Sequence, residues 1–135
     1  MGQREEMIEQ LESKSDSRRL EAIDYVKEFE DVEALPVLLR LMLDPVETVW
    51  TDLSKHRHPK IEAYRAAKVI ATEGLLLKSL IDRKFPETRA GAAYMLGEVA
   101  TPESADTIQA LRNALQDPDP RVPYQAMRSL SRLNA

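Results

Sequence analysis

The sequence predicts an all-α protein built as an α-solenoid, in which pairs of helices stack one after another. First, a helix–loop–helix–turn unit spans Pro86 to Pro120 and restarts after about 34 residues, a period typical of solenoids. Second, apolar residues recur at helical spacing along most of the chain. Third, aromatic residues make up only 5% of the 135 residues, so the core must be aliphatic. A unit this short cannot bury its apolar side alone, which is why such units share one core with their neighbours.

The alignment between repeats is most visible in the first helix of each unit. Ala126 and Leu130 repeat Ala92 and Leu96 one period later. A shift of roughly 70 residues, close to two periods, places Ala22 on Ala92. We therefore expect these alanines to occupy equivalent buried positions.

The residues from Arg89 to Gly97, with the sequence RAGAAYMLG, resemble the first helix of a HEAT repeat of the variety associated with phycobilisome lyases. Leu111, Leu115 and the DPDP sequence at 117–120 resemble the end of the second helix and the turn after it. The resemblance implies a right-handed α-solenoid (α-α superhelix) of about three HEAT-like helical hairpins plus a capping helix. Arg19 and Arg89 resemble the arginine of HEAT repeats, which implies that each pairs with an acid from a preceding turn. Asp82 and Asp117 are the candidate acids.

We predict a single HEAT-like repeat domain over residues 1–135. Its expected segments are an N-terminal capping helix (4–13), a first repeat (16–44), an insertion with a short helix and a basic loop (45–59), a second repeat (60–83), a third repeat (86–117) and a C-terminal half repeat (120–135).

The first segments follow from apolar spacing and capping residues. In the capping helix, Met7, Ile8 and Leu11 share one side. Asp16 or Ser17 is expected to cap a helix over 17–29, because its side-chain oxygen accepts a hydrogen bond from an otherwise unpaired amide. The partner helix, about 32–43, tolerates a proline in its first turn and ends at an Asp-Pro pair.

The insertion departs from the repeat. Its apolar residues recur at i, i+3, i+4 and i+7, which predicts one face of a short extra helix over 46–53. A basic loop, SKHRHP, follows at 54–59. A helix over about 60–72 comes next, and Gly74 is expected to mark the break before a second helix at 75–82.

In the third repeat Pro86 opens the first helix, and Thr101 is expected to cap the second, with Pro102 and Glu103 in its first turn. The last helix, about 121–133, has no following partner in this sequence. We expect its residues Met127, Leu130 and Leu133 to have little to pack against on one side. The expected consequence is either end-to-end dimerisation or a soft C-terminus.

An apolar stripe distinguishes the earlier second helices from the last one. Where the last repeat has Arg112 and Gln116, the first two repeats have four aliphatic residues: Leu39, Leu43, Leu77 and Ile81. Large aliphatic side chains left in water lose roughly 1.5–3 kcal/mol each relative to burial, so a cover is expected. The cover is either the inserted helix with Trp50 or a protein partner that contacts these residues, with Trp50 as its anchor; a second copy of this chain is included among such partners.

Basic residues gather in the segment 54–68 although the net charge of the chain is −4. Lys55, Arg57, Lys60 and Arg65 are candidates for binding phosphate, nucleic acid or an acidic protein surface. The alternative is an ordinary solvated charged loop, and the acidic total argues against general nucleic-acid binding. We predict no metal site, because His56 and His58 lie among cations.

Composition and motifs favour a non-catalytic scaffold or adaptor that binds a protein partner on its second-helix face. Cysteine is absent, the sequence has no membrane-length apolar run, and no catalytic motif or cofactor-binding motif is recognisable. We therefore expect a cytoplasmic protein with no cofactor. One alternative, implied by the resemblance, is a relative or subunit of a bilin lyase-type chromophore-handling protein. A second alternative is nucleic-acid or phosphate binding through the basic segment 54–68.

Overall fold

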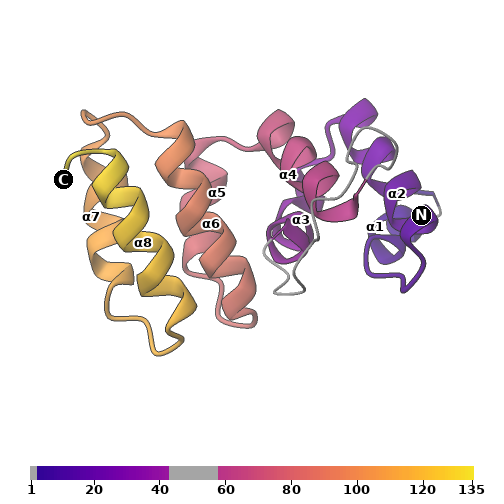
Figure 1. Cartoon of the computed structure of the whole chain (residues 1–135). Helices are drawn as coiled ribbons and strands as arrows, with labels where there is room; N and C mark the ends of the chain where they lie inside the picture. Colours follow the sequence, from indigo (N-terminus) through magenta and orange to yellow (C-terminus); the bar gives the residue numbers. More distant parts are fainter. Residues whose placement is uncertain (1–2, 43–57) are drawn as a thin grey trace. The chain divides into compact units, whose positions relative to one another are not determined.

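The computed structural model describes residues 3–42 and 58–135 (Figure 1). Within these residues every regular element is helical and none is a strand, which confirms the all-α prediction. The chain divides into two compact units, residues 1–70 and 71–135. The predicted helix over 46–53 lies outside the described residues.

The first unit contains α1 (Gln3–Gln10), α2 (Asp16–Phe29), the short 3-10 helix η1 (Val32–Ala34), α3 (Leu35–Met42) and α4 (Pro59–Ile70). Helix α4 packs against both α2 and α3, and α1 packs against α2. The fully buried side chains are aliphatic and small, as the composition predicts. They include Leu11, Ala22, Ile23, Val26, Leu35, Leu38, Leu39, Ala63, Ala66 and Ala67.

Polar side chains define the ends of helices in the first unit. Ser15 caps α2 by accepting a hydrogen bond from the Arg18 amide, so the expectation of Asp16 or Ser17 as the cap was wrong by one residue. Asp31 caps η1 by accepting from the Glu33 amide. Arg4 also donates to both carboxylate oxygens of Asp31, at 2.8 and 2.9 Å, which fastens α1 to the start of η1.

The second unit contains α5 (Glu73–Leu80), α6 (Pro86–Val99), α7 (Ala105–Ala114) and α8 (Arg121–Arg132). Helix α6 lies between α5 and α8 and packs against both, and α7 packs against α8 (Figure 1). The buried side chains, again mostly aliphatic, include Leu76, Leu80, Ala90, Ala92, Ala93, Met95, Leu96, Leu111, Val122, Ala126 and Leu130.

The 34-residue period appears in this unit as direct contacts between equivalent positions. Arg121 donates to Glu87 at 2.9 Å, and Thr107 donates to Glu73 at 3.3 Å; both pairs are 34 residues apart in the sequence. Ala22, Ala92 and Ala126 are each fully buried, the first in its own unit and the other two in the second. The sequence period is therefore a period in space within the second unit.

A buried glycine sets the closest approach of α6 and α8. A Cβ built on Gly97 would lie 2.8 Å from the Cα of Ser129, closer than real Cβ contacts allow. The Ser129 hydroxyl donates at 2.5 Å to the carbonyl oxygen of Ala93 on α6. Glycine at this position lets the two backbones meet, and the serine satisfies a helix carbonyl at the contact.

Three predictions about the second unit were wrong. Gly74 lies inside α5, and the break comes earlier, with Thr72 capping the helix through the Leu75 amide. Residues 101–104 form a turn instead of a first helical turn, so α7 begins at Ala105. Leu130 and Leu133 are buried, so of the three residues expected to lack packing only Met127 is exposed.

The arginine expectation needs a correction in direction. Arg89 pairs with Asp117 from the turn that follows its repeat, and it donates from Nη1 to the backbone carbonyl of Asp82 in the preceding turn. Arg19 pairs with Asp16, three residues before it on the same helix. Arg89 thus joins the turn before its helix to the turn after its repeat.

Candidate functional site

The second unit holds a groove of about 280 Å³ between the end of α5 and helix α7. Its apolar lining consists of Leu80 and Ile81 from the end of α5 and Ala110 and Ala114 from α7. Ile81 is 74% exposed, the highest fraction among the large apolar side chains of the described residues. The groove therefore presents an aliphatic surface to solvent at one side.

Polar groups line the rest of the groove. Asn113 and Gln116 contribute amides from α7 and the turn after it. The Asn113 side-chain oxygen accepts a hydrogen bond from Gln109 at 3.1 Å. The amides bring hydrogen-bonding groups beside an apolar surface, a combination typical of sites that recognise other molecules.

The Arg89–Asp117 pair forms one wall of the groove. Arg89 donates from Nε and Nη2 to the two carboxylate oxygens of Asp117, at 2.7 and 3.0 Å, and both side chains are mostly buried. The hydrogen bond from Arg89 and the amide of Asp119 lower the pKa of Asp117 despite its desolvation. A bidentate pair of this kind has fixed geometry, so it holds the two turns and the groove between them in place.

The residues predicted to contact a partner have different surroundings. Ile81 lines the groove, and Leu77, one turn earlier on α5, is half-buried. Leu39 is fully buried in the first unit. Leu43 and Trp50 lie outside the described residues.

The helical part of the basic segment is engaged in contacts within the first unit. Arg65 is exposed and donates at 2.9 Å to Glu62, a buried carboxylate that also contacts Lys27. Lys60 is half-buried, and its amide donates to Nδ1 of His58. Lys55, Arg57 and His56 lie outside the described residues. Anion binding by this segment stays a prediction.

No helix in the described part of the chain is long and apolar enough to cross a membrane. Among the same residues there is no group of three or more histidine or acidic side chains placed to hold a metal ion.

Comparison with known families bears on the second unit. Residues 74–135 match the family described as HEAT repeats. In the helix order of that family, α6 and α8 correspond to first helices and α5 and α7 to second helices, and the all-helical fold is of the α-solenoid class. No curated protein matches the chain significantly.

In HEAT-repeat terms, the groove lies between the second helices of two adjacent repeats. HEAT repeats commonly serve as surfaces for protein interaction, and stacked second helices are where such repeats offer extended binding surfaces. Comparison of the repeats in the sequence identified Ile81 and Leu77. It did not identify Ala110, Ala114 and Asn113, because each is unremarkable until α5 and α7 are placed side by side.

Proposed function

We propose that this protein is a non-catalytic binding scaffold whose HEAT-repeat unit holds a segment of another protein in the groove between α5 and α7. The observation that carries the proposal is the exposure of Ile81 beside Leu80, Ala110 and Ala114. An aliphatic side chain from a partner, placed against Ile81, would remove apolar area from water at roughly 25 cal/mol per Å².

The charges on the helices beside the groove favour an acidic partner segment. Lys78 is exposed on α5, three residues before Ile81, and Arg112 is exposed on α7, directly before Asn113. Each of these cations is therefore close in sequence to a residue that lines the groove. The fitting segment therefore carries an aliphatic side chain next to aspartate or glutamate, with its backbone within reach of the Asn113 and Gln116 amides.

A photo-crosslinking amino acid at position 81 tests this proposal in the native host. It should capture one partner protein repeatedly, and the same amino acid at exposed Val69 in the first unit should not capture it. An acidic peptide from the captured protein should then bind the purified chain. Ile81→Asp should weaken that binding at least tenfold, because it removes the apolar contact and places a negative charge beside the acidic peptide. Equal capture from positions 69 and 81, or unchanged binding by the Ile81→Asp variant, would refute the groove as the site.

The bilin-handling alternative is supported by the sequence resemblance alone. It predicts a change in bilin absorbance when the protein is mixed with a phycobiliprotein, and no change across several bilins would count against it. The nucleic-acid alternative predicts binding at low salt that weakens steeply as the salt concentration rises.

A further inference from the structure

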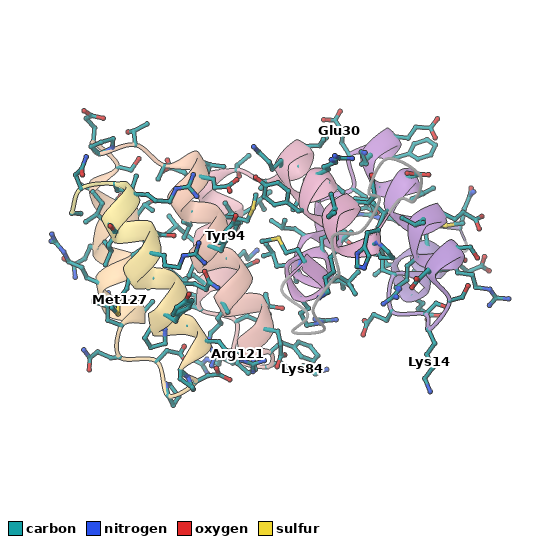
Figure 2. All side chains as sticks on the ribbon, viewed as in Figure 1. Lys14, Glu30, Lys84, Tyr94, Arg121 and Met127 are labelled. Carbon is teal, nitrogen blue, oxygen red and sulfur yellow. The ribbon has the colours of Figure 1, made fainter. Side chains whose placement is uncertain are left out.

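Helix α8 carries an exposed apolar pair within a basic surface. Met127 is 62% exposed (Figure 2), and Tyr124, three residues earlier on the helix, is 57% exposed. The same helix contains three arginines and no acidic residue. Together Tyr124, Met127 and the three arginines form what we call the α8 patch; the arginines are Arg121, Arg128 and Arg132.

The end of α2 in the first unit carries a similar pair within an acidic surface. Phe29 is 61% exposed and Val32 is 44% exposed, and the ring of Phe29 lies 4.7 Å from that of Tyr25. The flanking exposed residues are Glu28, Glu30 and Glu33. We call Phe29, Val32 and these three glutamates the α2 patch.

The α8 patch does not have the small residues that allow a further helix to pack as α8 packs on α6. One period earlier, Ala90 and Ala93 occupy the places of Tyr124 and Met127, and Gly97 occupies that of Ser131. The small residues of α6 permit the close approach at Ser129. Large side chains at the equivalent places of α8 instead protrude, so they suit a surface with apolar groups spaced to receive them.

We propose that two copies of this chain associate head to tail, with the α8 patch of one copy against the α2 patch of the other. The apolar pairs would cover each other, and the arginines of the α8 patch would face the glutamates of the α2 patch. Within their own units Arg121 also pairs with Glu87 and Asp119, Arg132 with Glu98, and Glu33 with Arg4, so Arg128, Glu28 and Glu30 carry most of the charge complementarity. Opposite charges across an interface favour the correct partner and suppress the wrong one. Contact between two α8 patches is disfavoured, because both surfaces carry Arg128 and neither patch contains an acidic residue.

This contact joins two different surfaces, so it leaves one patch of each kind free in a pair of chains. Such heterologous association continues into longer chains or closes into a ring. The average mass should therefore rise with protein concentration, and it should fall as salt screens the exposed charges.

Charge reversal at one residue of each patch tests the proposal. Arg128 is the target on α8, because Arg121 and Arg132 also contact Glu87 and Glu98 within the unit. Glu28 is the target on α2, where a cation near the helix end is compatible with folding. Arg128→Glu and Glu28→Arg should each weaken self-association about tenfold or more in sedimentation equilibrium, because like charges then meet.

Recombining the two changes distinguishes this contact from other modes of association. An equimolar mixture of the single variants should associate again, and so should the double variant R128E/E28R, because each restores opposite charges. Lys14→Glu changes the net charge as much as Arg128→Glu at an exposed site outside both patches, and should have no effect (Figure 2). Ile81→Asp should also leave the mass unchanged, since the groove is a separate surface.

Circular dichroism should show that each variant keeps the helical content of the parent chain. A parent chain that stays monomeric at all concentrations would overturn the proposal. So would association that Glu28→Arg leaves intact, the result expected of a contact between two α8 helices. Failure of the mixed variants to recover association would overturn it as well.

Discussion

The guanidinium of Arg121 lies 2.9 Å from the carboxylate of Glu87, a residue 34 positions earlier in the sequence. The two residues hold equivalent places at the start of α8 and α6. A second pair with the same spacing, Arg132 and Glu98, joins the other ends of the two helices at 3.5 Å. Both contacts follow the 34-residue register in which α8 lies on α6.

Gly97 offers the sharpest test of this packing. Gly97→Ala should lower the free energy of unfolding by roughly 1–3 kcal/mol, because the added methyl group would collide with Ser129 and force the helices apart. Gly74→Ala is the matched control, since a Cβ there has no atom within 4 Å. Gly74→Ala should raise the free energy of unfolding by about 0.4–1 kcal/mol, because alanine favours the helix and leaves the unfolded chain fewer conformations. Denaturant unfolding followed by circular dichroism measures both, and an equal effect of the two changes would contradict the close contact.

The Arg89–Asp117 pair should matter more than the exposed pairs. Asp117→Ala leaves the mostly buried Arg89 guanidinium without its carboxylate and should cost about 3 kcal/mol. Glu87→Ala removes the partner of Arg121 at the surface and should cost only about 0–1 kcal/mol. Chemical denaturation of the two variants gives the comparison. Similar losses would mean that the buried pair does not hold the two turns together.

Acid should destabilise the protein through three aspartates. Hydrogen bonds from Arg89 and Arg4 lower the pKa of Asp117 and of Asp31, and the bonds from Arg121 lower the pKa of Asp119 to about 2. A lowered pKa stabilises the folded state above the ordinary carboxyl pKa of about 4, and this stabilisation is lost as the pH falls towards the folded value. The free energy of unfolding should therefore decrease between about pH 4 and pH 2.

Asp117→Asn separates that contribution from the general effect of acid. Its free energy of unfolding should be lower at neutral pH and should fall less steeply on acidification, because the variant has one fewer depressed carboxyl group. Urea titrations of the parent chain and the variant at several pH values supply the slopes. Parallel slopes would rule out a role for Asp117 in the acid response.

Glu62 is a buried carboxylate that pairs with two cations of the first unit, Arg65 and Lys27. It accepts from Arg65 at 2.9 Å and from Lys27 at 3.4 Å, and so ties α4 to α2. Glu62→Ala should cost roughly 1.5–3 kcal/mol, the value of hydrogen bonds to a charged group. Glu62→Gln keeps the shape and part of the hydrogen bonding and should cost less. Amide hydrogen exchange in α2 and α4 would localise the loss, and equal losses in α6 and α8 would contradict a role confined to the first unit.

The repeat itself could be predicted because its signals are local and periodic. Small residues at Ala92 and Ala126 recur at a fixed spacing, and only close helix packing requires small residues at such spacing. The same periodicity identified Ile81, since an aliphatic residue stood where the next repeat had Gln116.

Features that depend on contacts between helices were harder to predict. Comparison with Arg112 placed Leu39 on an apolar stripe that needs a cover, without specifying the cover; Leu39 is fully buried in the first unit, where α3 packs against α4. Leu130 and Leu133 were expected to lack packing on one side because no helix follows α8. Both are buried, since α6 and α7 already pack against α8. Gly97 was visible as a glycine, but its role depends on where Ser129 lies, and periodicity does not specify that distance.

The most direct test of the stacked-repeat account is a nuclear Overhauser measurement between Gly97 and Ser129 in solution. The account predicts a strong cross-peak between the Gly97 α-protons and the Ser129 β-protons, because a Cβ at Gly97 would lie 2.7 Å from the Ser129 Cβ. It also predicts contacts between Ala93 and Ser129. Assigned spectra in which these protons show no cross-peak, with α6 and α8 both helical, would contradict the stacking of one repeat on the next.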